Sequence, residues 1–194
     1  MNRIAFAAAA GLAASAFATP AAAGIAGPRV EAFVGYESAT LDDFGSRDDV
    51  SEGGAVYGLG VGFDLPLGES VAIGVDLEAS DSNVSWRETS ALFDTDLRTT
   101  LGRDLYAGGR ITAAVTPGVN LYAKAGYTNL RSTVDFTSPT FSEIREANDG
   151  GLRGGVGAQF ALGGNAFVGA EYRISSYNGD LTRHQGVAAL GFRF

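Results

Sequence analysis

Apolar side chains alternate with polar or small ones along most of this 194-residue chain, with the period of two that is typical of β-strands. Stretches rich in glycine, proline or acidic residues separate the alternating segments. The pattern predicts eight strands, at about residues 28–38, 54–64, 70–79, 101–115, 119–128, 152–161, 166–174 and 187–194. Most of these lengths approach the roughly 9–11 residues that a tilted strand needs to cross a bilayer.

The connections between the predicted strands alternate in length. Those after the second, fourth and sixth strands are short, and two of them contain the turn sequences Leu65-Pro66-Leu67-Gly68 and Thr116-Pro117-Gly118. Those after the first, third and fifth strands are long and polar, and the one after the seventh is intermediate. This rhythm is typical of an eight-stranded antiparallel up-and-down transmembrane β-barrel, with short periplasmic turns and longer extracellular loops. We therefore expect an all-β fold with both termini on the periplasmic side.

Alternation alone does not say which face of the strands points inward, because a soluble lipocalin-like barrel has the same period. Three features favour lipid outside and charge inside. Glycines gather on the polar face, and the interior of an eight-stranded barrel has room for little more than side chains. Aromatic residues lie near the ends of the apolar faces, as an interfacial girdle requires: Tyr36, Tyr57, Phe63, Tyr127, Phe160, Tyr172 and Phe192. The polar face also carries charges of both signs, which can pair in an interior: Glu31, Asp76, Glu78, Asp104, Arg110, Lys124, Arg153, Glu171, Arg173 and Arg193.

The amino terminus has the parts of a secretory signal peptide. Arg3 is followed by an uncharged stretch over residues 4–17 and by the small residues Ala21-Ala22-Ala23. We expect cleavage of residues 1–23 and a barrel domain over 24–194.

Composition narrows the function. The formal charge is −8, and it becomes −9 once Arg3 is removed, which argues against nucleic-acid binding because that function needs basic patches. Cysteine is absent, so neither disulfides nor thiol chemistry are available. Lys124, Arg110 and Arg153 could line a conducting path, but a lumen of eight strands is normally filled. We therefore expect paired structural charges at these three positions.

His184 is the chain's one histidine, and Ser175, Ser176 and Asp180 lie close to it in sequence. A serine–histidine pair on the last two strands would suit a lipid-modifying enzyme. The spacing shows only proximity along the chain, so an exposed histidine at a loop edge is favoured and we expect no catalytic activity.

The first long connection is acidic enough to raise a calcium hypothesis. It lacks the spacing of a known calcium loop, so we expect a solvated loop, with neither metal nor cofactor. Two later segments, 80–100 and 130–149, hold aromatic or large apolar residues that suit either an adhesive surface or strands rising above the membrane. The residues concerned are Asp42, Asp43, Asp48, Asp49 and Glu52 in the acidic connection and Trp86, Phe93, Phe136, Phe141 and Ile144 in the later segments.

The export signal, the strand rhythm and the closing Leu190-x-Phe192-x-Phe194 resemble the small bacterial outer-membrane barrels of the OmpA/OmpX and opacity-protein type, also called porin-family outer-membrane proteins. The resemblance implies a bacterial outer-membrane location and contact with membrane lipid and lipopolysaccharide. It also implies that the outer-membrane insertion machinery reads Leu190, Phe192 and Phe194 as an assembly signal. No room follows Phe194 for the peptidoglycan-binding domain of full OmpA-type proteins, so we do not expect cell-wall anchoring.

These observations favour a monomeric structural and surface-interaction protein, whose acidic loops contact a surface ligand or host. A narrow channel for small solutes is the alternative, and a lipid-modifying enzyme is the less favoured one.

Overall fold

The computed structural model describes residues 25–41, 50–90, 95–138, 141–178 and 181–194. No helix in these ranges is long and apolar enough to cross a membrane. The strands are β1 Gly27–Leu41, β2 Val50–Pro66, β3 Val71–Ser82, β4 Ser85–Ser90, β5 Thr95–Thr116, β6 Val119–Ser138, β7 Phe141–Gly163, β8 Ala166–Tyr177 and β9 Leu181–Arg193.

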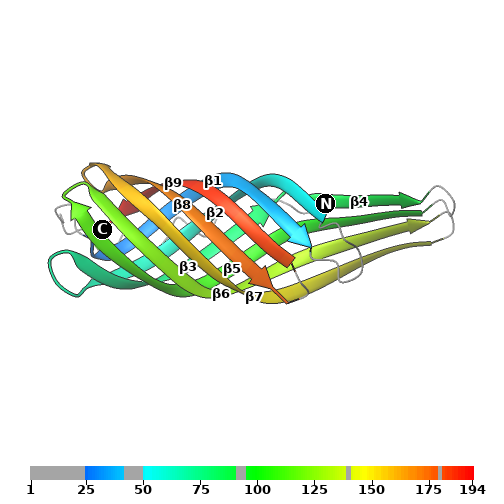
Figure 1. Cartoon of the computed structure of the whole chain (residues 1–194), viewed down its shortest axis with the longest axis horizontal. Coiled ribbons are helices and arrows are strands. Elements are labelled where there is room, and N and C mark those ends of the chain that lie inside the picture. The colour runs from blue at the N-terminus through cyan, green and yellow to red at the C-terminus, as the bar shows by residue number, and fades with distance from the viewer. Residues whose placement is uncertain (1–24, 42–49, 91–94, 139–140, 179–180) are drawn as a thin grey trace.

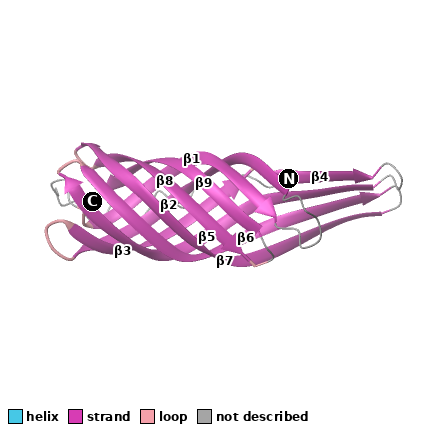
Figure 2. Cartoon of the chain, in the orientation of Figure 1, coloured by secondary structure: helices cyan, strands magenta, loops and turns pink. Residues whose placement is uncertain are grey.

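Eight of these strands pair antiparallel into a closed ring (Figures 1 and 2). The order β3-β2-β1-β9-β8-β7-β6-β5 is closed by pairing of β3 with β5. The strand that is not part of this ring is β4. It continues the line of β3 past Asn83 and Val84, because the first half of β5 pairs with β4 and the second half of β5 pairs with β3. The predicted eight-stranded, all-β fold is therefore confirmed, with β4 as an addition to it.

The two ends of the barrel differ. The short turns at residues 67–70, 117–118 and 164–165 lie at one end, which we call the turn end and which is on the left in Figure 1. The chain termini of the barrel meet there, since the Phe194 amide donates to the carbonyl of Pro28 over 2.9 Å. Gly163 and Gly164 have φ angles of 104° and 58°, which only glycine adopts at little cost. The opposite end, where strands β1, β6 and β8 finish, is called the loop end.

Three strands extend well beyond the ring at the loop end. β5, β6 and β7 contain 22, 20 and 23 residues, and together with β4 they form an open four-stranded sheet above the rim (Figure 1). The described parts of segments 80–100 and 130–149 are thus strand extensions, one of the two alternatives that the sequence left open. Their strands are longer than predicted, because a strand in water on both faces does not need apolar alternation.

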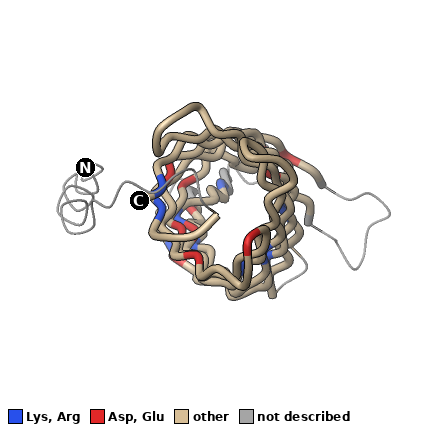
Figure 3. The backbone as a smooth tube through the Cα atoms, turned by 90° about the vertical axis from the view of Figure 1, so that its left-hand side faces the viewer, with Lys and Arg blue, Asp and Glu red and all other residues tan. Residues whose placement is uncertain are grey.

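The wall of the barrel is apolar outside and polar inside. Along β9, Leu190 and Phe192 are about half exposed, whereas Arg183 and Gln185 are buried. The seven predicted girdle aromatics all point outward, with the tyrosines toward the loop end and the phenylalanines toward the turn end. Figure 3, which looks in from the turn end, shows residues of both charges around the wall. The core of the molecule is therefore the inside of the ring.

Candidate functional site

The interior of the barrel holds a charge-balanced network of side chains. All ten charges predicted to lie inside do lie there; nine are buried, and the Arg193 side chain is 10% exposed. Four further buried charges join them, which gives seven acidic and seven basic residues. The interior network consists of Glu31, Glu37, Asp64, Asp76, Glu78, Asp104 and Glu171 with Arg29, Arg110, Lys124, Arg153, Arg173, Arg183 and Arg193.

The part of the network nearest the turn end is built around Asp64. The Nε atom of Arg29 donates to Asp64 Oδ2 over 3.1 Å, and its Nη2 atom donates to Asp76. Arg193 Nη2 reaches the same Asp64 oxygen at 3.3 Å and Gln159 Oε1 at 3.1 Å. The last strand is thus tied to β1, β2 and β7 through side chains as well as through its backbone.

The middle of the network pairs two glutamates with three cations. Glu78 accepts from Lys124 and, at 3.0 Å, from Arg173 Nη1. Glu171 lies 2.8 Å from Lys124 Nζ and accepts from Arg173 Nε at 2.7 Å. Arg153 Nη1 lies 3.6 Å from Glu78, and Arg153 also pairs with Asp104, so it links these side chains to the part of the network nearer the loop end. Every one of these side chains is almost fully removed from solvent, where an ion stays charged only when it is paired.

The part of the network toward the loop end is built around Asp104. Its carboxylate accepts from Arg153, from Arg183 Nη1 at 2.9 Å and from the Tyr177 hydroxyl at 2.7 Å. Thr128 Oγ1 donates to the other oxygen at 2.5 Å. One carboxylate thus holds four side chains from β6, β7, β8 and β9 in a single arrangement.

Glu37 completes this part of the network. It accepts from Arg183, from Gln185 Nε2 at 2.5 Å and from the Ser82 hydroxyl. Because Arg183 bridges Glu37 and Asp104, these buried contacts cross the interior from β1 to β5.

Aromatic side chains fill the interior space between the charges, and glycines make room for them. The Arg110 guanidinium lies 3.5 Å from the centre of the Tyr122 ring, and Arg173 lies 4.5 Å from the Phe33 ring. Gly157 faces Tyr122, and a Cβ atom there would lie 2.5 Å from the ring. Gly58 faces Phe33 in the same way, at 2.6 Å. The glycines of the polar face therefore accommodate large interior rings.

An apolar cluster lies inside the barrel at the loop end, above Asp104. Its members come from almost every side of the ring, and Trp86 packs against them. We call this cluster the apolar cap; it consists of Ala39, Val84, Leu101, Leu130, Tyr177 and Leu181.

Sequence reasoning missed several members of the interior network. Glu37 and Asp64 stand on the polar faces of predicted strands but were left out of the charged set. Arg29 stands at the start of the first predicted strand, and Arg183 precedes the last one. The alternation along β9 could have identified Arg183. Every second residue back from Arg193 and Gly191 lies on the same face, and the series reaches Gln185 and Arg183.

The structure separates the serine and histidine of the enzyme hypothesis. His184 is exposed on the outer face, and the Tyr172 hydroxyl lies 2.6 Å from its Nδ1 atom. Ser175 is fully buried inside, where it accepts from Arg153 Nε over 2.8 Å. Ser176 shares the outer face with His184, and Asp180 lies outside the described residues. His184 and Ser175 are therefore on opposite faces of the sheet.

The acidic connection is only partly described. Asp42, Asp43, Asp48 and Asp49 lie outside the described residues, and Glu52 is exposed on β2. Within the described ranges, no three histidine, cysteine or carboxylate side chains come together as a metal site would require.

Charge outside the interior network is concentrated at the loop end. The described residues of that half hold eight acidic residues against five arginines, and the segments 42–49, 91–94 and 179–180, which lie outside the described residues, add six acidic residues and one arginine in the sequence, a formal charge of −8 in all. Glu69 is the one further charged side chain, in a turn at the opposite end. This part of the chain is therefore acidic in formal charge.

Comparison with known proteins gives structural matches and a family. The attachment invasion locus protein Ail of Yersinia pestis, solved in complex with the heparin analogue sucrose octasulfate, matches with a TM-score of 0.54 at 15% identity, over 87% of this chain and 99% of that one. Neisserial surface protein A matches with a TM-score of 0.58 at 16% identity, over 86% and 97%. No curated protein sequence matches significantly. The family model of the outer membrane protein β-barrel domain matches residues 4–194. This match and the closed, outwardly apolar ring show that the chain belongs to the outer-membrane β-barrel family.

Proposed function

We propose that this protein is a closed structural barrel of the bacterial outer membrane that presents an acidic surface to the exterior. In this proposal it is neither a pore nor an enzyme. The single observation that carries the proposal is the interior itself, where a balanced network of buried charges lies beneath the buried apolar cap.

The interior network opposes passage of solutes. Asp104 and Glu37 hold side chains from several strands across the lumen, and the apolar cap lies above them. A solute path would have to separate buried ion pairs, and leaving one charge of such a pair alone costs about 3–5 kcal/mol. Lys124, Arg110 and Arg153 then act as structural cations rather than as the lining of a channel.

The orientation in the membrane follows from the two ends. Small outer-membrane barrels have short periplasmic turns and longer external loops, so the turn end and both termini would be periplasmic. Leu190 and Phe192 then face lipid near the periplasmic rim, where they and Phe194 would present an assembly signal to the insertion machinery. The ring leaves no unpaired strand edge within its wall, which supports a monomer.

The acidic loop end limits the surface partners. Ail was solved with a polysulfated heparin analogue. Here the loop end carries a formal charge of −8, which would repel such an anion. We therefore propose that the loops contact cationic ligands or host surfaces rather than sulfated polysaccharides.

The test is single-channel conductance of residues 24–194 in a planar bilayer, together with a gel assay in which the folded barrel migrates faster before heating. We expect heat-modifiable protein without conductance. Steps of conductance that change in Lys124→Gln would overturn the proposal and make the protein a pore. Sucrose octasulfate should not bind in a calorimetric titration, and binding at physiological salt would overturn the surface assignment.

A further inference from the structure

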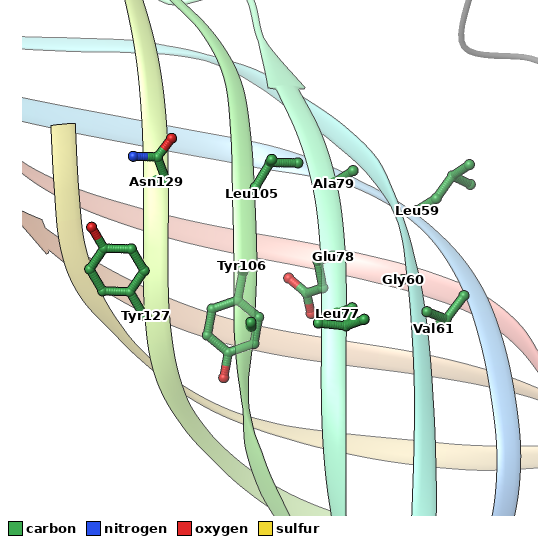
Figure 4. Close-up of a pocket in the computed structure, with 11 residues that line it drawn as sticks. Leu59, Gly60, Val61, Leu77, Glu78, Ala79, Leu105, Tyr106, Tyr127 and Asn129 are labelled. Atoms are coloured by element: carbon green, nitrogen blue, oxygen red, sulfur yellow. The ribbon is translucent and has the colours of Figure 1, made fainter. Parts of the chain in front are cut away.

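An apolar groove of about 520 Å³ crosses the outer wall of the barrel on strands β2, β3, β5 and β6 (Figure 4). Its floor contains Ala79 and Ala107, whose short side chains lie between larger neighbours. Leu59, Leu105 and Tyr127 border it, and all three are 40–56% exposed. A wall of uniformly large residues would have no such depression.

The register places the groove toward the loop end. Leu59, Ala79, Leu105 and Asn129 are paired across the four strands, and the row beneath them contains Ala107 and Tyr127. Tyr127 belongs to the outward tyrosines of the girdle, which mark the interface at that end. The groove therefore lies in the leaflet nearer the loop end, with the Asn129 amide at its polar limit.

Two arginines stand one row above the groove. A bulge in β5 sets Gly102 and Arg103 opposite Arg131 of β6, just beyond the pair Leu105 and Asn129. Leu130 points inward and is fully buried, so alternation directs Arg131 outward, and its Nη1 atom lies 3.3 Å from Glu146 of β7.

Both arginines retain unused hydrogen-bonding capacity. The Nε atoms of Arg103 and Arg131 are shielded from solvent, and neither has a hydrogen-bond partner among the described residues. A shielded guanidinium N–H without an acceptor is costly, and a phosphate oxygen is the acceptor that the fork geometry of arginine suits best. This pair of cations is an exception at the loop end, where most of the other charged residues are acidic.

We propose that the groove and this arginine pair form a binding site for a phosphorylated, acylated lipid of the outer leaflet. The acyl chain lies over Ala79 and Ala107, and the phosphate accepts from Arg103 and Arg131. Charge complementarity above an apolar depression selects such an amphiphile over an apolar protein partner. The site deepens the proposed function, since it depends on the loop end facing the exterior leaflet.

Native mass spectrometry of residues 24–194, titrated in detergent with bis-phosphorylated lipid A, tests the site. We expect one tightly retained lipid per barrel. The double variant Arg103→Gln, Arg131→Gln should bind about tenfold more weakly or worse, because it removes two charge-assisted contacts. Ala107→Phe should fill the groove and weaken binding as well. Arg145→Gln, which replaces an exposed arginine of the extension, and Ala188→Phe, on the outer face of β9, are matched controls that should leave binding unchanged.

Lipid A without phosphates, and inorganic pyrophosphate without acyl chains, separate the two halves of the site. Each should bind much more weakly than the complete lipid. Equal retention of lipid A by the wild type and the double variant, or equal loss in the Ala188→Phe control, would overturn the proposal. The gel shift shows that each variant is folded, and conductance is measured separately, so failure of this site and failure of the closed-barrel function give different results.

Discussion

At the scale of single residues, the interior is organised by carboxylates that each hold several donors. Asp104 accepts from two arginines, a tyrosine and a threonine, and it is 1% exposed. A buried carboxylate surrounded in this way cannot lose its charge without leaving the facing cations unpaired. A buried ion pair does not always make a protein more stable than an apolar interior would. Removing one partner of such a pair, however, strongly lowers the free energy of unfolding, because the other charge is left buried and unpaired.

Asp104→Asn should therefore destabilise the barrel strongly, by about 3–5 kcal/mol, since Arg153 and Arg183 lose the charge between them. Urea unfolding of the protein refolded in micelles, followed by the gel shift, measures the change. The matched control is Glu143→Gln, because the Arg145–Glu143 pair, at 2.7 Å, is solvent-exposed and should contribute little. If both variants unfolded at the wild-type midpoint, Asp104 would not organise the interior.

The identities of interior residues were predictable where alternation was clear. Glu78, Lys124 and Arg173 stand in the middle of strongly alternating strands, and the structure places all three inside. Arg183 was not predicted, because Leu181-Thr182-Arg183-His184 resembles a polar loop until it is paired with β1. Which charges pair with which also depends on the register and stagger of the ring, which no single strand specifies.

At the scale of elements, the strands pack through small residues on their inner faces. Gly108 of β5 and Gly126 of β6 are paired in register, and both point inward. A Cβ atom on Gly126 would lie 2.2 Å from the carbonyl oxygen of Ala107 and 2.4 Å from the Gly108 Cα atom. These contacts are to backbone, so a larger side chain cannot be accommodated by rotation of a neighbour.

Gly126→Ala should thus lower the free energy of unfolding by about 1–3 kcal/mol, the usual cost of overpacking. Gly154→Ala is the matched control on the adjacent strand, since nothing lies within 4 Å of a Cβ atom there. That variant should be neutral or slightly more stable, because alanine lowers the entropy of the unfolded chain. Urea midpoints of the two variants, measured side by side, decide the matter, and an equal loss in both would contradict the packing argument.

The last strand allows assembly to be separated from stability. The Phe194 amide pairs with Pro28 through its backbone, a bond that any non-proline residue can make. We therefore expect Phe194→Ala to refold in detergent with nearly the wild-type urea midpoint, yet to reach the outer membrane of cells in much lower yield. Gly27→Ala is no suitable control, because its φ angle is 107° and a Cβ atom there would meet the Phe194 carbonyl. Val30→Ala, on the paired strand, serves instead. An equal fall in yield for both variants would argue against an assembly signal in Phe194.

At the scale of the whole molecule, the closed ring of strands could be predicted from the sequence, whereas the length of the strands beyond the membrane could not. Membrane-spanning strands must alternate, so their number and the ring could be predicted from the pattern. The upper halves of β5, β6 and β7 carry mixed polar sequences, such as Phe141-Ser142-Glu143-Ile144, and lacked that constraint. Without that alternation the sequence did not distinguish a strand from a loop in these segments, and both alternatives were therefore left open.

We expect the ring to fold without the part of β6 and β7 that extends beyond it. Above the apolar cap, β6 and β7 pair with each other through Thr133↔Glu146 and up to Ser138↔Phe141, outside the closed ring. Replacing residues 134–145 with Asn-Gly gives a two-residue hairpin joining Thr133 to Glu146, a connection suited to antiparallel strands.

This shortened protein should still show the gel shift and remain closed to ions, because the interior network and the apolar cap lie below the cut. It should also retain lipid A, since Arg103 and Arg131 are kept, but lose any ligand that binds the tip of the extension. A shortened chain that failed to refold would mean that the extension nucleates or stabilises the ring. Loss of lipid A from a folded, shortened barrel would instead move the lipid site away from the bulge in β5 and up into the open sheet.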